Sequence, residues 1–450
     1  MVVKGTLIHT PVLGEMEIIE NALVTIDLGG KISSILSPGT AEYDNGVRTA
    51  LESSQLFELG DKQYLLPGLV DLHIHAPQWP QIGTALHLPL NEWLQECTFP
   101  LEAKYEDLEF ARQNYESLVD NLLANGTTTA TCFGTVHLEA TKLLAEICLA
   151  KGQRALIGKV AMDNVDECPA FYRDKSAASG LDDTRALIEH IRNLPGNADG
   201  RILPAVTPRF IPGCTDEMLE GLGSIAGEYN CHVQTHCSES DWEHQYVIER
   251  HGMNDAQSLD RFRLLTDKTV LAHSNLISDE DMSTIRARDS GIAHCPLSNI
   301  YFSNAVFPTR RALDLGLKIG LGTDISGGPN PSILHNCQAS VNSSRMLEEG
   351  VDPTAPTGKR GTPNSRISYL EAFWMATVGG AKTLGLQVGQ FAEGFNFDAI
   401  VVDAGVADTN LSAWEGSRSS EDALQKIVYN AERRNITNVW VQGKMVKGNG

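Results

Sequence analysis

Two histidines separated by a single residue, His73 and His75, stand in the short apolar run LVDLHIH. Alternate residues of a strand project to the same side, so both imidazoles can reach one metal ion. His236 in HCSES and Asp324 in GLGTDISGG add one nitrogen and one oxygen donor, a set that suits zinc, with iron as the alternative. An HxH pair alone is ordinary in strands. Together with the two further donors it predicts a hydrolytic metal centre.

Two more side chains could serve chemistry beside this centre. Glu239 follows His236 by three residues, just beyond a strand end, where a carboxylate can relay protons between water and a substrate. His273 ends the run TVLAH and could stabilise an attacking hydroxide or the negative charge that develops. A bound zinc ion lowers the pKa of its water from about 15.7 toward roughly 7, so hydroxide is the predicted nucleophile. For His294, in AHCP, a supporting or structural role is predicted.

A lysine on a barrel strand can bridge two metal ions when it is carbamylated. Lys159 lies in the third of the strand-like runs, whereas the fourth, where such a lysine would be expected by analogy, ends in Arg209. The sequence therefore favours one metal ion over two.

The residues that could position this chemistry are short apolar runs that alternate with helix-like segments, the rhythm of strand-helix units in a parallel sheet. Helix-start signals at Thr215 and Ser278 fall between such runs. Eight runs, the number that closes a TIM-type barrel, are found at Leu69–His75, Thr127–Phe133, Ala155–Met162, Ile202–Arg209, Cys231–Cys237, Thr269–His273, Gly291–Cys295 and Lys318–Asp324. Because barrel active sites lie at the carboxyl ends of the strands, the polar strand ends are expected to form one site.

Both ends of the chain have a different pattern, with short β-type runs between turn signals. These runs are Leu23–Ile26 and Lys31–Leu36, with no helix pattern up to Leu66, and then Asp398–Asp403, Ile427–Tyr429 and Val439–Val446. We therefore predict an α/β protein, a (β/α)8 barrel over residues 67–385, with a small β-sandwich domain formed by residues 1–66 and 386–450.

The composition of the chain narrows the class of molecule that the protein is expected to bind. The chain has 450 residues, with 36 Lys and Arg against 57 Asp and Glu, a net charge of −21 that repels phosphate backbones and anionic membranes. No secretory leader or membrane span is recognisable, and the nine cysteines are scattered singly. We expect a soluble cytoplasmic enzyme with reduced thiols that acts on a small molecule and binds neither nucleic acid nor membrane.

Several segments together resemble a known family. They are PGLVDLHIHAPQ at 67–78, LPLNEWLQECTFPLE at 88–102, NGTTTATCFGTVH at 125–137, TPRF at 207–210, HCSES at 236–240, AHSN at 272–275, AHCPLSN at 293–299 and GLGTDISGG at 320–328. The chain resembles the amidohydrolase superfamily through the histidines and the final aspartate. Through LPLNEWL, TFPLE, HAPQ and TPRF it resembles the guanine deaminases within that superfamily.

The resemblance implies a fold, a reaction and a set of residue roles. It implies one zinc ion held by His73, His75, His236 and Asp324, and guanine contacts from Gln78, Arg209, Phe210, Glu239 and His273. It also implies that water activated at the metal adds to C2 of guanine, that Glu239, Asp324 and His273 are catalytic, and that ammonia leaves to give xanthine. A homodimer is implied by the family alone.

Two departures and two alternatives accompany this interpretation. Trp79 follows Gln78 where a tyrosine is expected, and Ser274-Asn275 follow His273 where a glycine is common. The alternatives are a deaminase or dechlorinase of the same family that acts on a related aminated heterocycle, and a scaffold on the same fold without enzymatic function. The stretch 407–421, rich in small and polar residues, is predicted to be a surface loop.

Overall fold

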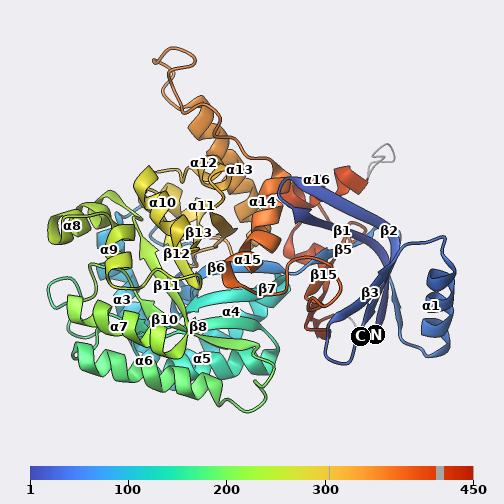
Figure 1. Ribbon diagram of the computed structural model, residues 1–450, viewed down its shortest axis with the longest axis horizontal. Helices are drawn as coiled ribbons and strands as arrows, with labels where there is room; N and C mark the ends of the chain where they lie inside the picture. The colour runs from blue at the N-terminus through green and yellow to red at the C-terminus, as the bar shows by residue number, and fades with distance from the viewer. Residues whose placement is uncertain (304, 412–419, 449–450) are drawn as a thin grey trace.

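The computed structural model describes residues 1–303, 305–411 and 420–448, and it places their strands in two sheets (Figure 1). One is a ring of parallel strands in the chain order of a (β/α)8 barrel, with the two-residue strand β9 (Val160–Ala161) beside β10. The ring consists of β6 (Leu69–His75), β7 (Thr127–Phe133), β8 (Arg154–Gly158), β10 (Ile202–Pro208), β11 (His232–Cys237), β12 (Thr269–His273), β13 (Gly291–His294) and β14 (Lys318–Leu321). The predicted barrel is confirmed.

The barrel strands are short runs that are almost wholly buried, as expected for parallel strands covered on both faces. Seven of the eight predicted runs coincide with one strand to within three residues. The eighth, Ala155–Met162, is two strands, β8 and β9, which flank Lys159.

The barrel closes where the segment after β14 meets β6. The backbone N–H of Asp324 donates to the carbonyl of His73 at 2.8 Å. The buried carboxylate of Asp71 accepts from the N–H of Thr323 at 3.0 Å and from the hydroxyl of the same residue. These bonds join the first and last strands and bring Asp324 next to the HxH pair.

Helices surround the barrel and connect its strands (Figure 1). The predicted starts are confirmed: the Thr215 hydroxyl accepts from the N–H of Met218 at the start of α7, and Ser278 forms a capping box with Asp281 at the start of α10. The α-helices from β6 onward are α2 (Leu90–Trp93), α3 (Phe99–Ala103), α4 (Leu108–Ala124), α5 (Leu138–Lys151), α6 (Ala177–Arg192), α7 (Asp216–Tyr229), α8 (Asp241–His251), α9 (Asp255–Arg261), α10 (Asp279–Ala287), α11 (Pro296–Ser298), α12 (Thr309–Asp314), α13 (Ile333–Glu349), α14 (Tyr369–Trp374), α15 (Gly380–Leu384) and α16 (Ser420–Asn430). Shorter 3-10 or π-helical turns are η1 (Ala76–Gln81), η2 (Leu94–Thr98), η3 (Lys104–Glu106), η4 (Asn299–Ser303), η5 (Met375–Gly379) and η6 (Arg433–Asn435).

The second sheet is built from both ends of the chain, as predicted, and is mixed. Its order is β17-β16-β15-β5-β1-β2-β3, with β4 paired to β1; β1 runs parallel to β4 and β5, and the other pairs are antiparallel. The strands are β1 (Val2–Val12), β2 (Glu15–Ile26), β3 (Ile32–Leu36), β4 (Leu56–Glu58), β5 (Gln63–Pro67), β15 (Ala399–Asp403), β16 (Ile436–Val441) and β17 (Lys444–Lys447). The domain limits 66/67 and 385/386 stay predictions.

Two local predictions were wrong. The N-terminal part contains a helix, α1 (Ala41–Glu52), because Tyr43 and Ala50, seven residues apart, bury one helical face against Val2 and Leu23 of the sheet. The predicted strand Ile427–Tyr429 belongs to helix α16, where buried apolar residues recur at helical spacing. Of the predicted surface loop 407–421, residues 412–419 lie outside the described residues and 420–421 begin α16.

Most cysteines are packed inside the protein, as predicted. Cys97 is partly exposed and the other eight cysteines are buried. Among the described residues, no helix has both the length and the apolar character needed to cross a bilayer.

A buried ion pair joins the two sheets. Arg154, at the start of β8, donates from Nε and Nη2 to the two carboxylate oxygens of Asp398 at 3.0 and 3.1 Å, and both side chains are buried. Asp398 precedes β15 and its carbonyl also accepts from the N–H of Gly68, in the link from β5 to β6. One residue therefore fixes the terminal sheet to the base of a barrel strand.

We expect Arg154→Met to lower the free energy of unfolding by about 3–5 kcal/mol, because it leaves the Asp398 carboxylate buried without its cation. Urea titration followed by circular dichroism measures the change. Lys151→Met, which breaks the exposed Lys151–Asp120 pair, is the matched control and should cost about 1 kcal/mol or less. Equal losses in the two variants would contradict the interpretation.

Candidate active site and metal centre

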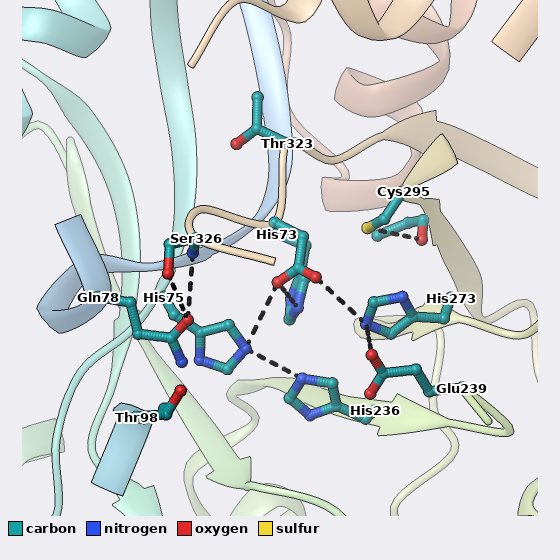
Figure 2. Close-up of polar contacts among 12 residues, drawn as sticks. His73, His75, Gln78, Thr98, His236, Glu239, His273, Cys295, Thr323 and Ser326 are labelled. Atoms are coloured by element: carbon teal, nitrogen blue, oxygen red, sulfur yellow. Dashed lines mark hydrogen bonds and ion pairs between the residues drawn. The ribbon is translucent and has the colours of Figure 1, made fainter. Parts of the chain in front are cut away.

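The four predicted metal ligands converge at the carboxyl end of the barrel, where Figure 2 shows His73, His75 and His236 close together. His73 Nε2 lies 3.2 Å and His75 Nε2 lies 3.6 Å from Oδ1 of Asp324. Nε2 of His75 is 3.0 Å from Nε2 of His236. Ligand atoms of His73, His75 and Asp324 all lie within 4.8 Å of one another, and the same holds for His73, His236 and His273.

The ring nitrogens of this cluster that lack hydrogen-bond partners fit a divalent cation. The Nε2 atoms of His73 and His273 are buried and have no hydrogen-bond partner among the described residues. Only one of two facing neutral imidazole nitrogens can carry a proton, so at least one of the His75 and His236 lone pairs points toward the other ring. Nitrogen lone pairs that converge on a carboxylate, with little exposure to water, match the donor set that zinc takes in hydrolases.

The environment keeps these histidines neutral, which is the form that binds a metal. Burial lowers the pKa of His73, His75 and His236 well below the usual value, and the positive charges of neighbouring histidines and of Arg209 add to the effect. Nδ1 of His236 hydrogen-bonds to the carbonyl of Arg209, which turns Nε2 toward the cluster.

Glu239, just beyond the end of β11, and His273, at the end of β12, face the cluster. His273 Nε2 lies 3.7 Å from Oε1 of Glu239 and 3.9 Å from Oδ2 of Asp324 (Figure 2). Burial raises the pKa of Glu239 well above its usual value, and the negative charge of Asp324 adds to the increase. Such a shift favours the protonated carboxyl group, the form from which a proton carrier donates.

The backbone of two of these residues is held in an uncommon conformation. His273 has φ 68° and Asp324 has φ 49°, in the left-handed region that residues other than glycine rarely adopt. Such outliers cost of order 1 kcal/mol or more and persist where the surrounding structure imposes them, commonly at functional sites. Here each outlier stands at a barrel strand end whose side chain faces the cluster.

Neighbouring amide side chains that were not predicted to belong to the site hold Glu239 and His273 in place. Asn299 Oδ1 lies 3.0 Å from Nδ1 of His273, so Nδ1 carries the proton and Nε2 keeps its lone pair for the cluster. Asn275 Nδ2 donates to the carbonyl of Glu239 at 3.0 Å and to the hydroxyl of Ser303 at 2.8 Å. Both asparagines lie in the quoted AHSN and AHCPLSN segments, which was the available signal.

A pocket that opens to solvent, with about 430 Å³ of space not filled by atoms, lies over the cluster. One wall is apolar and comes from the segment between β6 and α4, whose Trp93 ring meets Phe302 at 4.9 Å between centroids. The lining residues are His75, Gln78, Leu90, Trp93, Leu94, Arg209, Phe210, His236, Glu239, Glu243, Phe302, Asp324 and Gly327. All three predicted substrate contacts outside the metal cluster, Gln78, Arg209 and Phe210, belong to this lining; their roles stay predictions.

Glu102 is the main residue that the sequence did not identify. Its fully buried carboxylate accepts from Nη1 and Nη2 of Arg209 at 2.7 and 3.1 Å, and from Nε2 of Gln78 at 2.8 Å. It is the last residue of the quoted segment LPLNEWLQECTFPLE, but no periodicity places it beside Arg209. The structure thus joins two predicted contacts through one unpredicted carboxylate.

Lys159 and Trp79, the residue that departs from the family pattern after Gln78, lie outside the pocket lining. The buried Lys159 amine donates to Asp174 at 2.5 Å and to the carbonyl of Val160 at 3.1 Å. Trp79 donates to the hydroxyl of Ser117 on α4 at 3.0 Å. Neither Lys159 nor Trp79 is among the residues that line the pocket.

His294, at the end of β13, is buried against Phe307, with 5.3 Å between ring centroids. Neither of its ring nitrogens has a hydrogen-bond partner among the described residues. Burial, and secondly the charge of His273, lowers the pKa of His294 from 6.5 to about 3. The histidine is therefore neutral in the folded chain at every pH at which the protein is expected to work.

Comparison with known proteins places this geometry in a family context. Residues 64–446 match the amidohydrolase family. A probable guanine deaminase of Schizosaccharomyces pombe is 39% identical over 99% of this chain and 83% of its own length, and a guanine deaminase of Dictyostelium discoideum is 35% identical over 99% and 97%. The crystal structure of guanine deaminase from C. acetobutylicum, with guanine bound in its active site, has a TM-score of 0.88 at 29% identity and covers 99% of both chains.

The neutral state of His294 predicts a pH dependence of stability. An unfolded histidine titrates near pH 6.5, so between about pH 3 and 6.5 the unfolded state binds more protons than the folded state, and this contribution to stability is lost as the pH falls. We expect His294→Gln to flatten the rise of the unfolding free energy from pH 4 to 6 by up to about 1.4 kcal/mol per pH unit. Urea titrations at several pH values measure the slope. His87→Gln, at an exposed histidine, is the control, and identical slopes in the wild type and both variants would argue against the assignment.

Proposed function

The chain belongs to the amidohydrolase family and to the guanine deaminases within it, and from this premise we propose that it hydrolyses guanine to xanthine and ammonia. The observation that carries the proposal is one pocket in which a convergent set of metal ligands faces a paired arginine and glutamine. The first half of this site suits attack by water on an aminated ring. The second half suits the polar edge of a purine.

For the metal we propose one zinc ion, held by His73, His75, His236 and Asp324. The support is the nitrogen-rich donor set, its burial and the unpartnered ring nitrogens described above. When bound, such an ion lowers the pKa of a water molecule and makes hydroxide available at neutral pH.

The protein groups supply orientation and proton transfer. Guanine presents acceptors at O6 and N7, which suit the guanidinium of Arg209, while the amide of Gln78 can donate along the same ring and Phe210 packs against it. With C2 toward the metal cluster, ring nitrogen N3 comes to Glu239, which delivers a proton there so that no localised anion forms. Asp324 accepts a proton from the attacking water, and His273 stabilises the charge that develops.

In the proposed reaction the oxygen of one water molecule replaces the amino group on C2. The water oxygen bonds to C2 while one water proton passes to Asp324 and the Glu239 proton passes to N3. The bond between C2 and the exocyclic nitrogen then breaks as the C2 hydroxyl becomes a carbonyl and its proton returns to Glu239. The proton held by Asp324 reaches the departing amine with the help of Glu239, and the amine leaves as ammonia. The high pKa that burial gives Glu239 supports its use first as an acid and then as a carrier of the returned proton.

We expect purified protein to release ammonia from guanine with the absorbance change of xanthine formation. Metal analysis should give about one zinc ion per chain, and treatment with a chelator should abolish turnover, which added zinc restores. Metal without guanine turnover would favour the alternative, a deaminase or dechlorinase of another aminated heterocycle. A metal-free preparation with full biological activity would favour the scaffold alternative.

Glu239→Gln should lower kcat by about 10²- to 10⁴-fold while the zinc content stays the same, because the amide cannot carry the proton. Stopped assays of ammonia release and metal analysis of the same samples measure the two quantities. Glu249→Gln, at an exposed glutamate of α8, is the matched control and should keep wild-type rates. Wild-type rates in Glu239→Gln would remove the proton-carrier role.

The family resemblance also supports a homodimer in the cytoplasm. Analytical ultracentrifugation of the purified chain and localisation of a tagged copy test these two expectations.

A further inference from the structure

One carboxylate fixes the two side chains to which the proposed function assigns the purine edge. Glu102 is fully buried on α3, and three N–H groups from Arg209 and Gln78 converge on it at 2.7 to 3.1 Å. The negative charge of this carboxylate also acts on the buried Tyr172 hydroxyl, whose pKa is raised by burial and then by Glu102. A carboxylate is stable in the protein interior only when charged or hydrogen-bonding groups surround it. Folding must therefore bring Arg209 and Gln78 to Glu102.

The contact fixes which way the Gln78 amide points. Its Nε2 donates to Glu102, and its Oε1 accepts from the N–H and the hydroxyl of Ser326 at 3.1 and 3.4 Å. A flipped amide would place its oxygen against the carboxylate and its nitrogen against the Ser326 N–H. Gln78 therefore keeps one N–H for a ligand and cannot exchange its donor for an acceptor.

The contact also cancels the charge of Arg209. Both Nη groups donate to Glu102 side by side, and the guanidinium lies over the Phe99 ring, 5.0 Å from its centroid. Each Nη group retains a second N–H, and Nε retains its own. The pocket thus receives directed donors from a pair whose net charge is zero.

The neutralisation of Arg209 matters because guanine, the proposed substrate, and xanthine, the proposed product, differ in acidity. Replacing the amino group of guanine by a carbonyl makes a ring N–H a stronger acid, so xanthine becomes an anion in a growing fraction as the pH rises above neutrality. An unpaired guanidinium in a partly dry pocket would attract that anion. A neutral pair attracts it less and still hydrogen-bonds to the neutral base.

We infer that Glu102 is a positioning residue that aims Arg209 and Gln78 at a neutral purine and, by neutralising Arg209, weakens the hold of the site on the anionic product. This inference rests on the proposed function. It assigns to Glu102 two separable effects, on substrate affinity and on product release, with opposite signs.

The expected pH dependence comes from the ligand, because the titratable groups around the Glu102–Arg209 pair do not account for it. Those that interact with Glu102 or Arg209 outside the metal cluster are Tyr105, Tyr115, Tyr172 and Cys168. Burial raises the pKa of each, so all four stay neutral between pH 6 and 8.5. Glu239, Glu243 and Asp324 also face the pocket, and comparison of each variant with the wild type at the same pH removes their common contribution.

The test is steady-state kinetics of metal-loaded Glu102→Gln with guanine as substrate and xanthine as competing inhibitor, at pH 6 and pH 8.5. We expect KM for guanine to rise about 10- to 100-fold, because charge-assisted hydrogen bonds that aim the donors are lost. The inhibition constant of xanthine should rise together with KM at pH 6, where xanthine is neutral, and should rise on the order of tenfold less, or fall, at pH 8.5, where the anion no longer meets a neutralised guanidinium. A merely structural defect weakens xanthine binding by the same factor at both pH values, and that result would overturn the inference.

Two controls keep the outcome interpretable. Glu96→Gln, at an exposed glutamate of η2 on the same segment, should leave both constants unchanged. Glu102→Asp keeps the charge and should retain the wild-type pH dependence of xanthine inhibition even if KM rises.

A second variant covers the case in which Glu102→Gln does not fold. Arg209→Met leaves Glu102 negative, so xanthine inhibition should weaken by a larger factor at pH 8.5 than at pH 6. Equal factors at the two pH values would refute the charge argument. The proposed function itself is judged by guanine turnover of the wild type, so its failure is distinct from an unchanged xanthine ratio in a wild type that does turn guanine over.

Discussion

Closure of the barrel between its first and last strands is the interaction on which the site depends. Asp71 and the backbone of β6 bind the segment that follows β14, and the aspartate that ends this segment stands beside the two histidines of β6 only because of those bonds. The chain separation is 252 residues between Asp71 and Thr323, so no local preference could set the geometry. A metal ion held by both strand ends would strengthen the same closure, which makes the catalytic centre and the fold parts of one structure.

Charge is tolerated inside this protein where it is paired. Arg154 with Asp398 and Arg209 with Glu102 are two-point ion pairs with almost no exposure, and Lys159 with Asp174 is a third buried pair. Each would be costly without its partner, and the two arginine pairs join residues 244 and 107 positions apart in the chain. At the metal cluster the opposite condition holds, because nitrogen and carboxylate atoms converge there without saturating one another. The contrast separates groups that hold the fold from groups that are left free to bind a ligand.

The sequence predicted the barrel and most of the site because both follow from strand ends. A polar residue that closes a buried parallel strand must stand at the carboxyl face, so the pattern of strand ends alone was enough to group His73, His236 and His273. Glu102 could not be grouped with them, since it reaches the pocket from an irregular excursion between β6 and α4 whose path is set by tertiary packing. Short apolar runs were ambiguous for the same reason: Ile427–Tyr429 suits a strand or one face of a helix, and only its neighbours decide.

The terminal sheet, which draws its strands from both ends of the chain, sets an order on events during synthesis. Strands β1 to β5 leave the ribosome first, but β5 pairs with β15, which follows 332 residues after its end. At ordinary elongation rates this interval lasts roughly 20 to 60 s. Throughout it, one edge of β5 has unsatisfied backbone groups of the kind that recruit foreign strands. The nascent chain therefore carries an unpaired strand edge until β15 has been synthesised, a period in which chaperones would matter more for this protein than for the barrel alone.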